Sequence, residues 1–338
     1  MAKDKKKLAR VIATWVITVV MLSVFILDII TVALGNKYVN EISVTDETFD
    51  YKNGNDRIHF LNTANSDCII IESNGKFALI DSGEGNENPR RKTEYKGYRD
   101  EVINYIKKVA GDENGNVNFE FVLGTHMHYD HSGNFEAIFK DGQISANTAY
   151  FKEFNEKVAT ELETYDWGNR ETYEKILAVL EDKKIPVISD LPDTEFTFGD
   201  FTIRFINTET PEELYGNGEN ASSVGVIVKK GGKSAFLAAD FTKDSGLEQV
   251  YADDIGDIDL LKIGHHGYYG SSSMDFLKKL KPEIAIVTNY LGKIYPNVKW
   301  NLTMVAKVPV FSTAHRNGII ATFTDKNEII LTQNTMER

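Results

Sequence analysis

The sequence predicts an α+β fold in which two mixed β-sheets pack together with helices outside, preceded by one N-terminal transmembrane helix. A long apolar segment near the N-terminus indicates the transmembrane helix. After it, hairpins, helices and single strands alternate along the chain, a pattern typical of packed mixed sheets. Metal-binding residue types follow several apolar strands directly, so loops at one edge of the sheets are expected to form a single site.

The transmembrane helix is predicted over residues 11–34, which are almost wholly apolar and follow a basic run at residues 1–10. About 20 apolar residues cross the hydrocarbon core of a bilayer, so the segment is long enough. Its only charge, Asp28, lies near the far end, where an interface can solvate it. The alternative is a secretory signal cleaved near Gly35, but the apolar run exceeds the roughly 7–15 residues of a signal core. In both cases the positive-inside rule leaves residues 1–10 in the cytoplasm and exports the body.

The folded domain is expected at residues 56–335, after a polar, Asn- and Asp-rich tether at residues 35–55. Its first part contains β-rich runs at 58–62 and 66–73, a turn at 73–76, and a strand that ends at Asp81. Apolar residues at helical spacing predict a helix over 99–110. A buried strand over 119–126 then leads into a loop rich in histidine. These runs indicate a hairpin, a helix and a strand in that order.

The second part of the domain continues the alternation of helices and strands. Helices are expected at 134–140, over most of 153–181 with a break at 167–169, and at 276–280. Strands are expected at 146–152, 184–190, 195–209, 222–240, 258–264, 283–289, 308–313, 319–324 and 328–333, with hairpins inside 195–209 and 222–240. His59 lies within a strand and His315 within a late turn, and both are interpreted as structural residues.

Composition limits the kinds of site that the chain can form. The formal net charge is −12; residues 1–10 hold five basic and one acidic residue, or +4, so the remainder carries −12 − 4 = −16. An acidic body repels polyphosphate, which disfavours a broad nucleic-acid surface but admits a small phosphodiester to a cationic metal pocket. The single cysteine, Cys68, excludes an intramolecular disulfide and a cysteine-based zinc site. A metal site must therefore use histidine and carboxylate ligands, which suit zinc, manganese or iron.

The segment Thr-His-Met-His-Tyr-Asp-His-Ser-Gly at residues 125–133 concentrates such ligands. His126 and His128 are two residues apart, so an extended loop can aim both imidazoles in the same direction. Asp130 and His131 are adjacent and must diverge, which favours a second metal beside the first. Asp240, at the end of a strand, is a natural bridging carboxylate. Two divalent ions about 3.5–4 Å apart can hold a hydroxide nucleophile and stabilise displacement at phosphorus or carbonyl carbon.

Other catalytic motifs do not occur in the sequence. It contains no Gly-X-Ser-X-Gly nucleophile elbow, no Walker loop and no dinucleotide-binding fingerprint. The two adjacent histidines at 265–266, in Lys-Ile-Gly-His-His-Gly, again follow an apolar strand. Metal-dependent chemistry is therefore the expected chemistry of this chain.

The run His-Met-His-Tyr-Asp-His resembles the HxHxDH signature of the metallo-β-lactamase superfamily, and the resemblance covers residues 56–335. The segments that end at Asp81, Asp240 and Gly267 fall where that superfamily has its first aspartate, its bridging aspartate and its last histidine. The resemblance implies an αββα sandwich with a binuclear site. By position, it assigns His126 and His128 to one metal, Asp130 and His131 to the other, and Asp240 to both.

The resemblance also implies roles outside this loop. The last ligand would be His265 or His266, with His266 preferred because it directly precedes Gly267. Asp81 would orient the histidine loop without binding metal. Many superfamily members supply a third histidine to the first metal, but no histidine lies between His131 and His265. Asn220 stands near that place, so Asn220 or water would complete the first site, and a mononuclear enzyme is the alternative.

Two closer likenesses within the superfamily imply different substrates. The strand runs and the aromatic insert around 150–180 are similar to the phosphorylcholine esterases that trim choline from teichoic acids. Other runs, including residues 58–73 and 260–267, look like the exported hydrolase domain of the competence channel that degrades one DNA strand during uptake. Trp167, Tyr268 and Tyr269 could hold a quaternary ammonium group on their aromatic faces.

The expected function is that of a membrane-anchored, exported hydrolase with two divalent metals, zinc first and manganese as the alternative. A metal-bound hydroxide would attack phosphorus in a small-molecule or cell-wall phosphodiester, with Asp130 and Asp240 as catalytic residues. The alternative is a nuclease or nucleotide phosphodiesterase, although nucleic acid is not the favoured partner. A second alternative is a non-catalytic binding module that keeps the fold.

Overall fold

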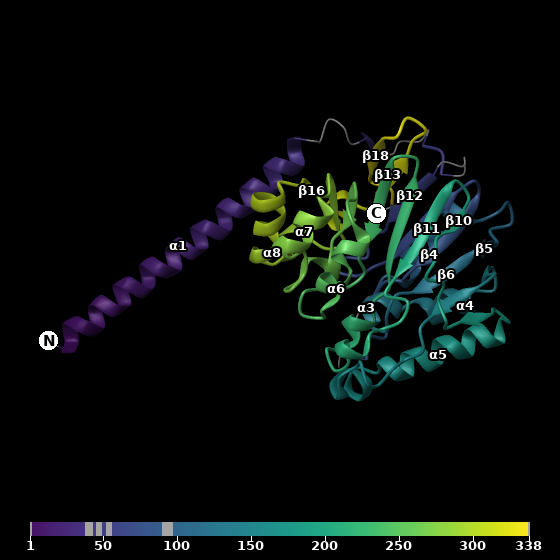
Figure 1. The fold of residues 1–338 in the computed structure, drawn as a ribbon, viewed down its shortest axis with the longest axis horizontal. Helices are drawn as coiled ribbons and strands as arrows, with labels where there is room; N and C mark the ends of the chain where they lie inside the picture. Colours follow the sequence, from purple (N-terminus) through teal and green to yellow (C-terminus); the bar gives the residue numbers. More distant parts are fainter. Residues whose placement is uncertain (1, 38–42, 45–48, 52–55, 90–96, 337–338) are drawn as a thin grey trace.

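A computed structural model describes residues 2–37, 43–44, 49–51, 56–89 and 97–336 (Figure 1). A long helix extends from a layered body that contains two sheets. The first sheet has the strand order β1-β18-β17-β2-β3-β4-β6-β8-β9, and the second has the order β10-β11-β12-β13-β14-β15-β16. The α+β fold expected from the sequence, an αββα sandwich after one N-terminal apolar helix, is confirmed.

The helices occupy both outer sides of the body. They are α1 (Ala2–Lys37), α2 (Arg99–Ala110), α3 (Tyr129–Ser132), α4 (Phe135–Lys140), α5 (Asn169–Asp182), α6 (Leu247–Ile255), α7 (Met274–Leu280), α8 (Pro296–Trp300) and α9 (Thr313–Arg316), with short helical turns η2 (Leu162–Asp166), η3 (Glu212–Leu214), η4 (Glu219–Ser222), η5 (Gly264–Gly267), η6 (Leu291–Lys293) and η7 (Asn301–Ala306).

The strands fall on the expected runs, with ends displaced by up to three residues, and β1, β5 and β7 were not expected as separate strands. They are β1 (Ser43–Val44), β2 (Asp56–Phe60), β3 (Ile69–Ser73), β4 (Lys76–Ile80), β5 (Val117–Phe119), β6 (Phe121–Gly124), β7 (Ile144–Ala146), β8 (Ala149–Phe151), β9 (Val187–Ile188), β10 (Phe196–Phe198), β11 (Phe201–Ile206), β12 (Gly225–Lys230), β13 (Lys233–Leu237), β14 (Leu260–Lys262), β15 (Ile284–Val287), β16 (Val310–Ser312), β17 (Ile319–Phe323) and β18 (Ile329–Gln333). Strands β5 and β7 pair separately as a small two-stranded sheet.

Three apolar clusters explain why the sheets and helices stack in layers. One cluster lies between the two sheets and contains Ile69 and Ile71 of β3. The second joins the outer face of the first sheet to α2, α4 and α5, and Ile70 of β3 belongs to it. The third joins the outer face of the second sheet to α6, α7 and α8. Because successive strand residues point to opposite faces, a strand buried on both sides reads as a continuous apolar run, as β3 does.

The turn between β3 and β4 fixes the register of that hairpin. Asn74 and Gly75 both have positive φ angles, of 50° and 72°, as the tightest hairpin turns require. The pairing then runs from Ser73 opposite Lys76 to Ile69 opposite Ile80. His59, on neighbouring β2, is fully buried and contacts Tyr105 and Glu72 at 3.0 Å each, so its structural role is confirmed.

Parallel pairing brings the ends of several strands to one edge of the body. Strand β4 runs parallel to β6, and β13 runs parallel to β14. Asp81 follows β4, the histidine loop follows β6, Asp240 comes shortly after β13, and η5 follows β14. The carboxyl ends of parallel strands meet at the same sheet edge, which explains how residues far apart in sequence come together.

The N-terminal helix is longer than expected and touches the body at one end. Residues 4–34 are long and apolar enough to cross a membrane. The helix continues to Lys37, into the segment expected to be a tether, and its C-terminal turns lie against α8, η7 and β16 (Figure 1). Most of the remaining tether lies outside the described residues. Within it, β1 pairs in parallel with β18, so this part belongs to the first sheet.

Candidate metal centre

Asp81 fixes the start of the histidine loop. Its Oδ1 accepts a hydrogen bond from the Thr125 backbone N–H at 2.8 Å, and its Oδ2 accepts one from the Thr125 hydroxyl at 2.8 Å. The same Oδ2 lies 2.7 Å from Nδ1 of His131. The backbone N–H of the next residue, Ser82, donates to the His131 carbonyl at 2.6 Å. One buried carboxylate thus holds both ends of the loop from 125 to 131, the role that the sequence resemblance implied for Asp81.

Hydrogen bonds to the loop histidines leave one ring nitrogen of each facing inward. The Thr125 hydroxyl donates to Asp81 and therefore accepts from Nδ1 of His126, at 3.1 Å. Nε2 of His128 lies 3.0 Å from Oε1 of Glu163. Although burial raises the pKa of Glu163, the hydrogen bond from His128 and others outweigh it and lower that pKa to about 2. Glu163 is therefore an ionised acceptor, and it leaves Nδ1 of His128 as the free nitrogen.

His266 is oriented from behind in the same way. Its Nδ1 lies 3.1 Å from the Thr288 hydroxyl, which itself donates to Oδ1 of Asp67 at 2.6 Å. Burial alone would raise the pKa of Asp67, but Lys262 and the nearby histidines outweigh it and hold that pKa below its usual range. Thr288 must therefore accept from His266, whose free nitrogen is Nε2.

The inward nitrogens form two groups that share Asp240. In the first group, Nε2 of His126 lies 3.2 Å from Nδ1 of His128 and 3.6 Å from Oδ2 of Asp240. In the second group, Nε2 of His131 lies 3.1 Å from Nε2 of His266 and 3.1 Å from Oδ1 of Asp240. Each oxygen of Asp240 thus faces a different pair of histidines, which is the arrangement of a bridging carboxylate.

The second group needs a cation at its centre. In their neutral forms, with Nδ1 as the donor, His131 and His266 both have a lone pair on the facing Nε2 atom, so the two atoms repel each other without a positive charge between them. Oδ2 of Asp130 lies 3.6 Å from Nε2 of His266 on the same side. One proton can link two acceptor atoms. This group has four, namely Nε2 of His131, Nε2 of His266, Oδ1 of Asp240 and Oδ2 of Asp130. A divalent cation with nitrogen and oxygen ligands satisfies all four, and zinc, manganese and iron accept such a donor set.

Polar atoms without partners support the same fit. Among the described residues, Oδ1 of Asn220 is buried without a hydrogen-bond partner, and both carboxylate oxygens of Asp240 are buried facing imidazole nitrogens at 3.1 Å or more. A buried polar atom without a partner costs free energy that a bound cation would recover. Asn220 comes from η4 and lines the same cavity as His128, Asp130 and Asp240. The residues present therefore fit two cations.

The carboxylates of Asp67 and Asp130 both lie near the histidine rings of the second group, but on opposite sides of them. Asp67 lies 3.8 Å from Nδ1 of His131 and 3.3 Å from Nδ1 of His266, so it faces the outer side of both rings. Its ion pair with Lys262 occupies that outer side. Asp130 instead faces Nε2 of His266, on the inner side. Asp130 is thus the geometrically suitable ligand, and Asp67 orients the rings.

The adjacent histidines of η5 diverge because of their backbone. His265 and His266 have φ angles of 48° and 51°, and Gly267 has a φ angle of 76°. A side chain on Gly264 would come 2.2 Å from the Phe241 carbonyl oxygen, so only glycine allows this close approach. His266 is fully buried in the second group, whereas His265 lines the cavity with Nε2 3.8 Å from Oδ2 of Asp240. The geometry favours His266 as a ligand.

The cavity over the two groups has a volume of about 520 Å³. It is lined by Asn65, Glu84, Asn88, His128, Asp130, Glu163, Trp167, Asn220, Asp240, His265 and Tyr268. The Trp167 ring lies 5.4 Å from that of His128, and the Tyr268 ring lies 5.6 Å from that of His265. Tyr269 lines a different cavity, and 62% of its surface is exposed. Of the three aromatic residues proposed from sequence, two therefore line this cavity.

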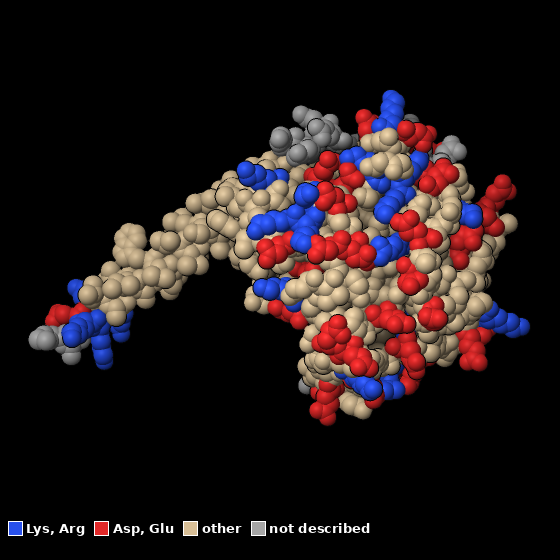
Figure 2. All heavy atoms as spheres, viewed as in Figure 1, with Lys and Arg blue, Asp and Glu red and all other residues tan. Residues whose placement is uncertain are grey.

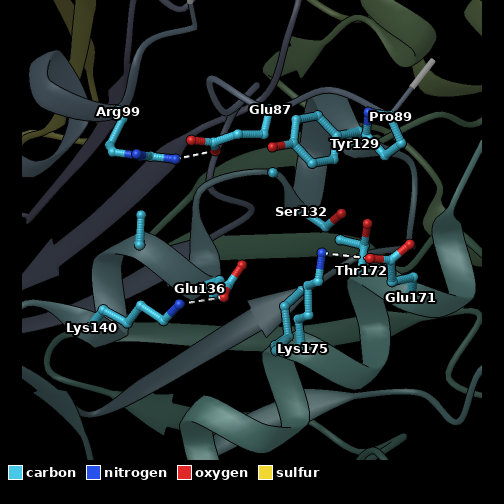
Figure 3. A pocket seen from close by; sticks show the side chains of 13 residues that line it. Glu87, Pro89, Arg99, Tyr129, Ser132, Glu136, Lys140, Glu171, Thr172 and Lys175 are labelled. Carbon is cyan, nitrogen blue, oxygen red and sulfur yellow. Dashed lines mark hydrogen bonds and ion pairs between the residues drawn. The ribbon is translucent and has the colours of Figure 1, made fainter. Parts of the chain in front are cut away.

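A separate cavity of about 490 Å³ lies behind α3 and carries no comparable chemistry (Figure 3). Its three pairs of opposite charge are Arg99 with Glu87, Lys140 with Glu136, and Lys175 with Glu171. The latter two pairs have nitrogen–oxygen distances of 2.6 Å along single helices. Because these charges compensate one another, this cavity is a solvated surface hollow rather than a metal centre.

Several residues of the site were missed in the sequence. Asp67, Glu163 and Thr288 hold ring nitrogens from outside the recognised motifs. Lys262 offered one visible signal, because it interrupts the apolar run Leu-Leu-Lys-Ile-Gly. In the structure it is fully buried and pairs with Asp67. Glu163 offered none, because its contact with His128 joins residues 35 apart in sequence.

Comparisons with known proteins yield partial sequence relatives and distant structural neighbours. No family model matches the chain. Recombination protein 2 of Haemophilus influenzae is 28% identical over 107 residues, which cover 32% of this chain and 12% of that protein. ComE operon protein 3 of Bacillus subtilis is 26% identical over 115 residues, covering 34% of this chain and 14% of that protein. The matches thus span only about an eighth of each curated relative.

Solved structures are similar over a larger share of the chain. The metallo-β-lactamase fold protein YhfI from Bacillus subtilis covers 76% of this chain and 95% of its own, with 12% identity and a TM-score of 0.44. Zinc-bound PqqB from Methylobacterium extorquens covers 76% and 97%, with 13% identity and a TM-score of 0.43. The diiron β-hydroxylase CmlA from Streptomyces venezuelae covers 76% and 52%, with 15% identity and a TM-score of 0.42. Of these three structures, YhfI is the one described by its fold, as a metallo-β-lactamase fold protein.

Proposed function

We propose that this protein is a membrane-anchored, metal-dependent hydrolase that cleaves a phosphodiester of the cell envelope. The observation that carries the proposal is the position of Asp240. Its buried carboxylate lies between two groups of imidazole nitrogens, with Oδ1 3.1 Å from Nε2 of His131 and Oδ2 3.6 Å from Nε2 of His126. A buried carboxylate in such surroundings is expected to bind cations.

Each group would hold one ion with ligands from different loops. His126, His128 and Asp240 would hold one, completed by Asn220 or water; Asp130, His131, His266 and Asp240 would hold the other. Two divalent cations would supply hydroxide at neutral pH and neutralise charge that develops on the phosphoryl oxygens. Zinc is the first expectation and manganese the alternative.

The protein's own side chains orient these ligands and shape the cavity. Asp81, Glu163 and the Asp67–Thr288 pair each keep a proton on the outer nitrogen of a histidine ring, so the inner nitrogen stays available. Such outer partners typically contribute 10–100-fold to metal affinity or activity. His265 and Tyr268 line the cavity and offer hydrogen bonds to a substrate.

The lining of the cavity favours a phosphodiester that carries a positive group. Among the described residues, those lining it include Glu84, Trp167 and Tyr268 but no lysine or arginine. Aromatic faces and a carboxylate attract a quaternary ammonium group. The body surface is also acidic, as the red side chains in Figure 2 indicate. These features support a phosphorylcholine-like substrate.

A nuclease or nucleotide phosphodiesterase is the second candidate, and the sequence relatives favour it. Recombination protein 2 and ComE operon protein 3 are the curated proteins whose sequences resemble this chain. The matches include only 12–14% of those proteins, so a shared activity is a hypothesis for this chain. A substrate panel separates the two candidates.

The panel compares p-nitrophenylphosphorylcholine, bis-p-nitrophenyl phosphate and single-stranded DNA, each with zinc or manganese. We expect hydrolysis of the choline ester at least ten times faster than hydrolysis of the other two, and loss of activity in Asp240→Asn. Preferential hydrolysis of DNA or of the bis-p-nitrophenyl ester would instead support the second candidate. Inactivity on all three with either metal would favour a binding module.

The apolar helix supports the proposed location. Lysine and arginine gather at its free end, while its middle is free of charge (Figure 2). The positive-inside rule then places the N-terminus in the cytoplasm and the hydrolase domain outside. Added protease should therefore digest the domain in intact cells or spheroplasts, and full protection of the domain would contradict export.

A further inference from the structure

The C-terminal part of α1 carries a stripe of side chains that pack on the body. Leu27 and Thr31 are buried, and Val24, Asp28 and Leu34 are half-buried, at the spacing of one helix face. Asp28 forms an ion pair with Lys299 of α8. The body therefore meets the helix at a defined level instead of being separated from it by a flexible linker.

That level coincides with the expected boundary of the hydrocarbon core. The apolar residues from Leu8 to Ile26 are mostly exposed, which in water would be unfavourable. About 20 helical residues, at 1.5 Å each, span the roughly 30 Å of hydrocarbon. If the span begins near Val11, just after Arg10, about 20 residues bring it to Ile30, within the part of α1 that packs on the body. The elements that contact this part of α1 must then lie at the membrane surface.

The elements at this level present large side chains outward. Trp300 of α8 is 53% exposed, Met304 of η7 is 40% exposed, and Tyr295, directly before α8, is 43% exposed. Trp300 directly follows Lys299, the partner of Asp28. Tryptophan and tyrosine favour the interface between hydrocarbon and water, because their rings are apolar with a polar edge.

The charge of the same region differs from that of the rest of the body. Residues 284–324 include no aspartate or glutamate but contain Lys293, Lys299, Lys307 and Arg316. The chain beyond residue 10 carries −16, so a stretch of this length without acidic residues is a local exception. Basic side chains around exposed aromatics match the negative surface of a bilayer with anionic lipids.

We propose that Tyr295, Trp300 and Met304, flanked by Lys293 and Lys307, form a surface that rests in the headgroup region of the bilayer holding α1. This inference rests on the proposed membrane anchor and adds an orientation of the domain to it. The Tyr295 ring lies 6.0 Å from the ring of Tyr268, which lines the cavity of the metal centre. The proposed surface therefore lies next to Tyr268, one of the side chains that line that cavity.

Fluorescence quenching by lipid tests the proposed contact. The chain has three tryptophans, so the full-length Trp15→Phe/Trp167→Phe variant leaves Trp300 as the sole emitter. It is reconstituted in phosphatidylcholine–phosphatidylglycerol vesicles whose acyl chains are brominated near the headgroup. We expect Trp300 emission to shift to the blue and to fall at least twofold relative to unbrominated vesicles.

A matched control places the tryptophan elsewhere on the same body. Ile188 of β9 is 37% exposed and lies at the end of the first sheet opposite to β1 and β18, so Ile188→Trp combined with Trp15→Phe, Trp167→Phe and Trp300→Phe should remain unquenched. The protein floats with the vesicles if the anchor is correct. If it floats but Trp300 is not quenched, or if both positions are quenched equally, the surface contact is refuted while the anchor stands. Failure to float with vesicles would refute the anchor and the contact together.

Amide hydrogen exchange of the unmodified chain gives a second measurement that needs no substitution. Peptides from residues 295–306 should exchange at least threefold more slowly in vesicles than in detergent micelles, whereas peptides from β9, at the other end of the first sheet from β1, should not change. Equal exchange of residues 295–306 in both media would contradict the contact even if the tryptophan variants fail to fold.

Discussion

At the scale of single residues, the site depends on carboxylates that do not touch the proposed ions. Asp81, Glu163 and Asp67 lie behind the histidine rings and determine which nitrogen faces inward. Replacing such a partner leaves every ligand in place but frees the ring to change its tautomer and orientation. The effect should therefore appear first in metal affinity.

Glu163→Gln tests this at the first group. The amide can no longer accept a charge-assisted hydrogen bond from Nε2 of His128, so metal affinity should fall by 10–100-fold. Titration with zinc in a competing chelator measures the change. Glu171→Gln, in an exposed ion pair near the other cavity, is the matched control and should bind zinc normally. Unchanged affinity in Glu163→Gln would mean that this carboxylate is dispensable.

At the scale of elements, a buried ion pair joins the two sheets beneath the site. Lys262, at the end of β14, pairs with Asp67, which precedes β3, and both side chains are at most 1% exposed. Lys262 also donates to the Ala239 carbonyl, next to Asp240. The pair thus fixes the distance between the loop that carries Asp240 and the elements behind the histidines.

Lys262→Met should leave Asp67 buried with one fewer partner. Removing one member of a buried pair typically costs about 3–5 kcal/mol of unfolding free energy, which denaturant titration would measure. Lys279→Met removes an exposed lysine from its pair with Asp253 and should change stability by less than about 1 kcal/mol. Equal stability of the two variants would contradict a role for the Lys262 pair.

The same pair predicts how stability depends on pH. The pKa of Asp67 is lower in the folded protein than in the unfolded chain, because Lys262, together with His266 and His131, outweighs the effect of burial. Its contribution is therefore complete above the ordinary aspartate pKa and is lost as the pH falls toward the lowered value. Acid should destabilise the wild type more steeply than Lys262→Met, and parallel acid-unfolding curves would contradict this.

The elements themselves were largely predictable, whereas their polar contacts were not. The β-rich run at 66–73 predicted strand β3, and helix α2 occupies the expected residues 99–110. Such patterns are local. Asp67, by contrast, is one of many polar residues that precede a strand. Its role depends on the contact with Lys262, which lies 195 residues later in the sequence. The sequence therefore predicts where the loops meet better than which side chains orient the ligands.

At the scale of the whole molecule, the metal centre connects loops from both sheets. His126, His128 and Asp130 follow the first sheet, whereas Asp240 and His266 follow the second. Ions held between them would bind only the folded chain. Ligand at 100 times its dissociation constant adds about 2.7 kcal/mol to stability, so chelation should lower the melting temperature by several degrees. Calorimetry with and without chelator measures this, and an unchanged melting temperature would indicate that no ion had been bound.

The central claim is that Asp240 bridges two cations, and the metal content of the full-length protein tests it most directly. Elemental analysis after reconstitution with zinc and removal of free metal should find two ions per wild-type chain. Asp240→Asn should retain less than one. Fewer than one ion in the wild type, or two ions retained in Asp240→Asn, would contradict the claim.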